Sequence, residues 1–242
     1  MDEKYYYDLI NMDTIDYNGL KIYPIPFKEI KEEIGYDALM KCMMPFCLTK
    51  EYIEITNNCK LDDNFNVFED IILKDENSLK NTAIVLKLYC KPEHIYYNKT
   101  NITLTDENDK EIFVLTKDNY DDVAEILLVL NSKSKLKAEK PPANMSERQR
   151  DVWEKLQAGR LREKQKNEVH FYDILNTCEY LGYYRIPMEE LFTWTIWKII
   201  NCYNAKTGMK IYDDDLSISI ESHDLKPIQG NNHWSKKLMI RN

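Results

Sequence analysis

The sequence predicts an α+β protein in two parts: an N-terminal mixed domain with two β-hairpins and helices at residues 1–130, and a mainly helical C-terminal domain at residues 146–206. Two hairpin patterns lie among helical patterns in the first part. A polar, basic stretch containing Pro141-Pro142 separates the parts and is predicted to be a linker at residues 131–145. Residues 207–242 are predicted to form an extended C-terminal tail.

The first hairpin is predicted at Thr14–Tyr23. Its centre is Asn18-Gly19, the dipeptide that a type I′ turn favours because both central residues need positive φ. Prolines follow the second strand and end it.

The segments after this hairpin are less regular. Phe27–Cys47 carries apolar residues at helical spacing and is predicted to be a helix, weakened by Gly35 and Pro45. Lys50–Thr56 alternates between polar and apolar residues, which predicts a short strand. Val67–Leu73 fits neither period clearly.

The rest of the N-terminal part shows clearer boundaries. Three elements are predicted there: a helix that Asn77 or Ser78 caps and that runs to Cys90 before Pro92, a hairpin of Asn101–Thr105 and Glu111–Leu115, and a helix Tyr120–Leu130 capped by Asp118.

A charged helix is predicted at Glu147–Asn167, where Ser146 and Gln149 form a capping box. Residues 131–168 contain 11 Lys/Arg against 6 Asp/Glu, in a chain whose net charge is −8. This helix has few large apolar residues and would not be stable alone, so we expect it to pack against another surface.

The residues that organise the C-terminal domain are Val169–Tyr203, predicted as two helices broken at Gly182–Pro187. The second helix begins at Pro187 and is apolar on more than one side, with Trp194 and Trp197 off the centre of its main stripe. Two interpretations stay open: it is the central helix of a small bundle, or its tryptophan face binds a partner.

The last segment is predicted to lose helical structure at Gly208. Ile211–Ser222 alternates after a triple aspartate, which favours an edge strand. The tail beyond it carries Trp234, which must pack on its own chain or on a partner.

Composition excludes several function classes. Hydrophobic residues make up 43% of the chain and only six glycines occur, with no glycine-rich nucleotide loop. Six cysteines without a CxxC pair indicate free thiols in a reducing cytoplasm. The acidic, polar N-terminus does not resemble a signal peptide, and no apolar run is long enough to span a membrane.

No catalytic, cofactor-binding or metal-binding residues can be assigned, so we expect a protein that is not an enzyme and has no cofactor. Cys90 and His94 form the only close Cys/His pair, which is too few ligands for zinc. The triple aspartate Asp213–Asp215 is interpreted as a solvated turn. No triad or paired-carboxylate pattern stands out.

Nucleic acid is a weaker candidate for a partner. The basic helix at 148–166 offers charge, but Trp153 is its only aromatic residue for base stacking. The more ordinary interpretation of such a helix is a solvated face, or a face that packs against the protein's own acidic surface.

The order of elements resembles the tail assembly chaperones of tailed phages that infect Gram-positive bacteria. The stretches that carry the resemblance are NGLKIYPIPF, ITLTDENDKEIFVLTKDNYDDVAEIL, SERQRDVWEKLQAGRLREKQK, MEELFTWTIWKIINCY and KPIQGNNHWSKKL.

This resemblance implies a non-enzymatic protein-binding factor in the host bacterial cytoplasm that chaperones the tape measure protein, with that protein or a tail tube subunit as partner. A structural tail or connector component of the virion is the alternative, and a nucleic-acid-binding regulator is a weaker one. A homo-oligomer stays open. The candidate partner-binding residues are Trp194, Trp197 and Trp234, with Trp153 the weakest of the four.

Overall fold

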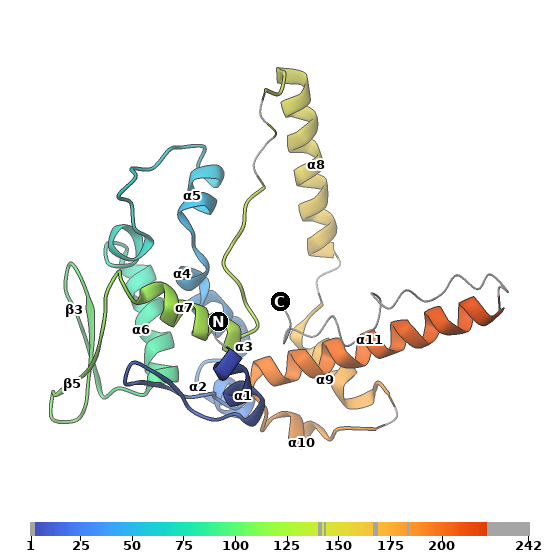
Figure 1. Ribbon diagram of the computed structural model, residues 1–242, viewed down its shortest axis with the longest axis horizontal. Helices are drawn as coiled ribbons and strands as arrows, with labels where there is room; N and C mark the ends of the chain where they lie inside the picture. Colours follow the sequence, from blue (N-terminus) through green and yellow to red (C-terminus); the bar gives the residue numbers. More distant parts are fainter. Residues whose placement is uncertain (1–2, 140–141, 143, 167–168, 183, 222–242) are drawn as a thin grey trace.

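The computed structural model describes residues 3–139, 142, 144–166, 169–182 and 184–221. Helices α1 to α7 and two small antiparallel sheets form a body, and helices α8 to α11 form the C-terminal region (Figure 1). The predicted α+β class is therefore confirmed, with the strands confined to the N-terminal half.

The chain begins with α1 (Glu3–Asn11), a helix that the sequence did not predict, and continues into the predicted hairpin of β1 (Ile15–Tyr17) and β2 (Leu20–Ile22). Asn18 and Gly19 have φ values of 50° and 89°, which a type I′ turn requires. The hairpin prediction is confirmed.

The predicted long helix at 27–47 is divided into α2 (Phe27–Glu33), α3 (Tyr36–Cys42) and α4 (Met44–Cys47). Gly35 separates the first two with a φ of 81°. Pro45 occupies the first turn of α4, where a missing N–H is tolerated, but it could not continue α3.

The predicted strand at 50–56 is wrong, because these residues form helix α5 (Lys50–Thr56). Thr49 caps the helix by accepting a hydrogen bond from the Tyr52 N–H at 3.1 Å. The same Thr49 hydroxyl donates to the carbonyl of Leu136 at 3.1 Å, so the cap also holds the start of the linker.

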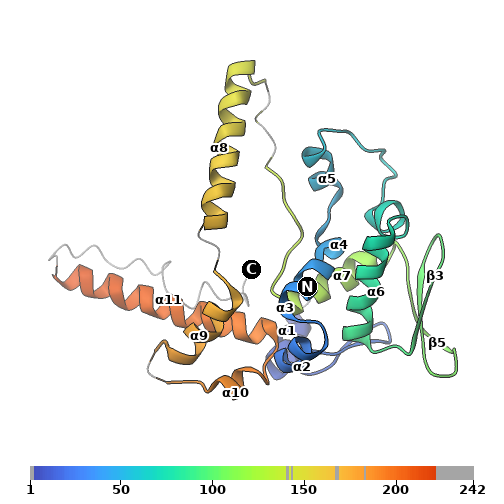
Figure 2. The same cartoon turned by 180° about the vertical axis from the view of Figure 1, so that it is seen from behind.

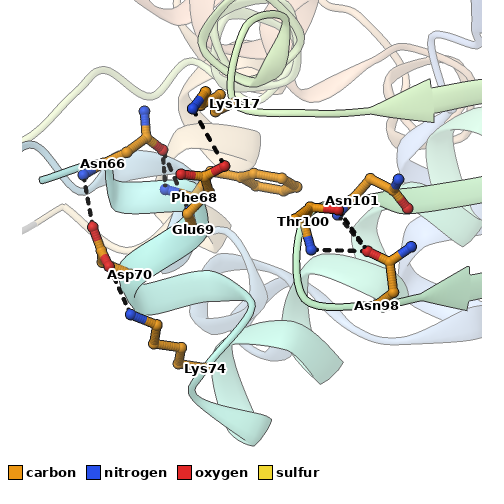
Figure 3. A network of polar contacts seen from close by, with 9 residues as sticks. All are labelled: Asn66, Phe68, Glu69, Asp70, Lys74, Asn98, Thr100, Asn101 and Lys117. Atoms are coloured by element: carbon orange, nitrogen blue, oxygen red, sulfur yellow. Dashed lines mark hydrogen bonds and ion pairs between the residues drawn. The ribbon is translucent and has the colours of Figure 1, made fainter. Parts of the chain in front are cut away.

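The ambiguous segment at 67–73 forms a π-helix, η1 (Phe68–Ile72), that buries Phe68 and Ile72. Asn66 Oδ1 accepts from the backbone N–H groups of Phe68 and Glu69 at 2.9 and 3.3 Å. Asp70 accepts from the Asn66 N–H at 2.9 Å and from Lys74 Nζ at 2.7 Å, as Figure 3 shows. Side-chain caps thus set the start of this turn.

Helix α6 (Glu76–Cys90) runs as predicted, but its cap is Asp75, whose carboxylate accepts from the Ser78 N–H at 2.7 Å. Neither predicted cap residue is used, since the observed cap lies two residues before Asn77. It ends at Lys91, which adopts a left-handed conformation before Pro92.

The predicted second hairpin is confirmed as β4 (Ile102–Thr105) and β5 (Glu111–Leu115). A third strand, β3 (His94–Tyr97), which was not predicted, pairs with β4 to give the order β3-β4-β5. Asn98 holds the β3–β4 turn by accepting from the N–H groups of Thr100 and Asn101 (Figure 3).

Helix α7 (Tyr120–Leu130) has the predicted bounds and is buried around most of its circumference. The predicted cap Asp118 is wrong: Asn119 stands at the cap position and makes no side-chain cap bond. The Tyr120 ring stacks against Phe46 and Phe68, with ring centroids 5.9 and 5.0 Å away.

Helix α8 (Glu147–Lys166) starts at the predicted capping box. The Ser146 N–H donates to Gln149 Oε1 at 2.8 Å, and the Gln149 N–H donates to Ser146 Oγ at 3.4 Å. Both ribbon views show α8 standing away from the body (Figures 1 and 2).

The C-terminal region contains α9 (Phe171–Tyr180), α10 (Met188–Leu191) and α11 (Ile196–Glu221). The predicted break at 182–187 is confirmed. The predicted helix from Pro187 to Tyr203 is wrong, because a turn separates α10 from α11.

The predicted helix end at Gly208 and the predicted strand at 211–222 are also wrong for the described residues up to 221, which continue α11. Gly208 is buried inside the helix. Lys210 and Asp214, one turn apart, form an ion pair at 2.6 Å on its surface, so the aspartate run is helical rather than a turn.

The two halves share one core. The Phe27 N–H donates to the carbonyl of Trp194 at 2.8 Å, and the Lys28 N–H donates to that of Phe192 at 2.9 Å. The Phe171 ring of α9 stacks on Tyr36 with centroids 4.1 Å apart. These contacts fix the base of the C-terminal helices on the body.

Candidate protein-binding surfaces

Trp197 is not a surface residue. Its side chain is 3% exposed, between the buried residues Ile196 and Ile199 of α11. This part of α11 packs against α1, α7 and α9, so the indole is covered by its own chain. The expectation that Trp197 offers its ring to a partner is therefore corrected.

Trp194 lies in the turn before α11 and not on the helix with Trp197. Its side chain is half-buried, and Lys198 Nζ lies 4.9 Å above its ring. Since its carbonyl also binds the backbone of α2, this residue joins the two halves of the chain. The predicted common tryptophan face does not exist. Trp234 lies outside the described residues.

Trp153, the weakest candidate in the sequence, has the more open surroundings. Its side chain is half-buried on α8. Its neighbours on the same side of the helix, Val152 and Leu156, are 52% and 58% exposed. These three side chains line a hollow of about 470 Å³ together with Pro142 and Met145. Val152, Trp153 and Leu156 thus form a small apolar ridge along one side of α8, at the edge of this hollow.

A second hollow separates this ridge from the body. It has a volume of about 630 Å³ and is lined by Arg150, Trp153 and Glu154 of α8 and by residues at the end of α5, among them Ile55 and Cys59. Within the described residues, α8 has no extensive packing against another element. Its side chains therefore leave space on both sides of Trp153.

The charges of α8 are mixed, with a basic excess. Exposed basic side chains include Arg148, Arg150 and Arg162. Arg160 and Gln157 both bind the Glu139 carboxylate of the linker, at 2.9 and 2.6 Å. These bonds are exposed and hold α8 weakly beside the linker.

Helix α11 forms a second projecting arm (Figures 1 and 2). Beyond its contact with α9 it exposes Met209 (38%) and Ile211 (50%). A hollow of about 510 Å³ lies between this stretch and the loop after α9, where Tyr184 is 85% exposed. Lys206 Nζ holds the loop by donating to the carbonyl of Tyr184 at 3.1 Å.

No catalytic arrangement appears in the described part of the chain. A hollow of about 600 Å³ beside Tyr120 contains an ion pair of Lys135 and Asp121 at 2.8 Å. His94 Nε2 lies 4.0 Å from the exposed Asp109 carboxylate, and the His170 ring stacks on that of Tyr172.

Among the described residues, no three His, Cys, Asp or Glu side chains group closely enough to bind a metal ion. None of the described helices combines the length and apolar character needed to cross a membrane.

The chain matches no protein-family model, no curated protein and no solved structure. Among the side chains that the structure describes, the ridge on α8 (Val152, Trp153 and Leu156) is the most exposed apolar group on a projecting helix.

Proposed function

We propose that this protein is a non-enzymatic protein-binding factor in phage tail assembly that chaperones the tape measure protein, as the resemblance in its sequence implies. The observation that carries the proposal is the exposed apolar ridge on α8, a helix that stands clear of the body.

Helix α8 has little packing against the rest of the described chain, which supports the idea that it packs against a partner protein. In proteins most of the stability of a helix comes from tertiary packing. Helix α8 is 20 residues and about 30 Å long but has little packing of this kind within the described residues. Its Val152 and Leu156 are one turn apart, which is the spacing that one helix presents to another. Burying both would supply the packing that its own chain does not.

An amphipathic helix suits this surface as the occupant. The tape measure protein of a tailed phage is expected to be a long amphipathic helix, whose apolar stripe is insoluble when exposed. The ridge would cover part of such a stripe, and the basic side chains beside it would pair with acidic residues that flank the stripe. The net charge of −8 would keep the complex soluble.

The test is co-expression with a tape measure fragment and measurement of the soluble fraction of that fragment. The wild-type protein should raise this fraction, and Val152→Ser/Leu156→Ser should abolish the effect. A matched control is Tyr97→Ser/Ile112→Ser, which changes two exposed apolar residues of the β3-β4-β5 sheet (65% and 44% exposed). Equal precipitation with and without the wild-type protein rejects the proposal.

The alternative role as a virion subunit makes a different prediction about the mature particle. Mass spectrometry of purified particles should not detect a chaperone, whereas a tail or connector component would be present in stoichiometric amount.

A further inference from the structure

Two cysteines from different helices face each other where α9 packs on α11. The Cys178 side chain is fully buried, and its thiol donates to the carbonyl of Ile199 at 3.4 Å. Lys206 Nζ donates to the carbonyl of Cys178 at 2.5 Å. Ile199 and Lys206 flank Cys202 at spacings of three and four residues, which places all three on one face of α11. Cys202 therefore lies between the two points where α11 contacts Cys178.

We propose that Cys178 and Cys202 form a redox-active thiol pair that a hydroperoxide converts into a disulfide between α9 and α11. Packed helices lie about 8–10 Å apart and their Cα atoms lie about 2.3 Å from each axis, so directly facing Cα atoms are about 3.4–5.4 Å apart. A disulfide spans about 4.4–6.8 Å between Cα atoms. The bond can form without separating the helices.

The two thiols have different roles. The contact with the Cys178 thiol and the positive charge of Lys206 lower the pKa of Cys202, against the opposing effect of burial. The contact with Cys202 and burial raise the pKa of Cys178. Cys202 is only half-buried, so a small oxidant can reach it. It is the attacking thiolate and Cys178 is the resolving thiol.

The remaining internal thiols are poorer nucleophiles. Burial raises the pKa of Cys42 and of Cys47, and it raises that of Cys90 to about 12. The protonated form that burial favours does not attack peroxide.

The reaction balances in two steps. The Cys202 thiolate attacks the terminal oxygen of the hydroperoxide; an S–O bond forms, the O–O bond breaks, and the alkoxide leaves with a proton as an alcohol. The sulfur of Cys178 then attacks the Cys202 sulfenic acid; the S–S bond forms, the S–O bond breaks, and hydroxide leaves with the Cys178 proton as water. Two thiols are oxidised and one hydroperoxide is reduced.

The disulfide would tie the base of the α11 arm to α9 and close the segment that contains α10. A reducing cytoplasm keeps the pair as thiols until an oxidant appears. This inference does not depend on the proposed function.

The experiment treats the full-length protein with hydrogen peroxide, blocks free thiols, and maps the peptides after trypsin digestion. Arg185 and Lys198 lie between the two cysteines, so trypsin separates them and only a disulfide keeps the two peptides together. A Cys178–Cys202 peptide that dithiothreitol releases is the expected product. Overoxidised Cys202, or unmodified Cys202 under conditions that oxidise the exposed Cys59, overturns the proposal.

Variants separate this pair from general thiol oxidation. Cys59→Ser should leave the crosslink unchanged. Cys178→Ser, which keeps a hydrogen-bonding group beside Cys202 but cannot form a disulfide, should leave Cys202 as a sulfenic acid that dimedone traps. Lys206→Met should slow alkylation of Cys202 by iodoacetamide roughly threefold or more, because the thiolate fraction falls, while Lys206→Arg should restore the rate. If Lys206→Met and wild type react at the same rate, the role of Lys206 is rejected.

Discussion

The rings of Phe27 and Phe171 lie with their centroids 4.9 Å apart and their planes tilted by 51°. Phe27 opens α2 in the N-terminal half, and Phe171 opens α9 in the C-terminal half. Both are buried, and Phe192 packs against the other side of Phe27 with centroids 5.4 Å apart. This aromatic cluster makes the body and the base of the C-terminal helices one cooperative unit.

Phe171→Ala should lower the free energy of unfolding by about 3–5 kcal/mol, because it removes a buried ring and leaves a cavity in this cluster. Denaturant unfolding followed by tryptophan fluorescence measures the loss. The neighbouring Tyr172→Ala is the matched control: its side chain is 62% exposed, and we expect a change within about 0.5 kcal/mol. Equal effects of the two substitutions would contradict the shared core.

The Tyr89 hydroxyl donates to Asn131 Oδ1 at 2.8 Å, and both residues are buried. Tyr89→Phe should cost about 1–3 kcal/mol, because the Asn131 oxygen would stay buried without a donor. Tyr96→Phe removes a hydroxyl that donates to Asp109 at 2.9 Å on the exposed surface. Chemical denaturation of this control should show little change, since water replaces the lost bond.

Thr49 caps α5 and also binds the linker through Leu136. Thr49→Ala should destabilise the protein by about 1 kcal/mol, the usual cost of a lost N-cap. Thr49→Ser keeps the hydroxyl and should retain most of the stability. Thermal unfolding of both variants provides the comparison, and a Ser variant as unstable as the Ala variant would argue against the capping bond.

Stability should fall as the pH drops below about 4. Hydrogen bonds from Ser78 lower the pKa of Asp75, and the hydrogen bond from Lys74 is the main cause of the lowered pKa of Asp70. A carboxylate with a depressed folded-state pKa stabilises the fold above its unfolded pKa and loses this effect as the pH falls through the folded value. Asp75→Asn keeps an acceptor oxygen and should flatten the acid limb of a stability–pH curve; an unchanged limb would contradict this assignment.

Trypsin should cut the free protein first within α8, at Arg148, Arg150, Lys155 or Arg160, because few contacts protect that helix. Bound partner should slow these cuts. Time courses followed by mass spectrometry would show the order. Early cleavage within the buried α7–α6 core, with α8 intact, would be inconsistent with this arrangement.

Local sequence determined the elements whose geometry depends on near neighbours. The Asn18-Gly19 turn and the Ser146–Gln149 capping box form as predicted, since positive φ and first-turn N–H groups are satisfied within four residues. The buried helix α7 was also predictable, because its apolar residues extend around most of the helix.

Only the tertiary structure decided the rest. Alternating residues in α5 and in the outer part of α11 fit a strand as well as a helix. The Thr49 cap selects the helix in α5, and the outer part of α11 continues a helix whose base packs against α9. The burial of Trp197 and the meeting of Cys178 with Cys202 depend on which helices touch. Periodicity shows that a face is apolar, but the contact between elements distant in the chain determines whether its own fold covers that face.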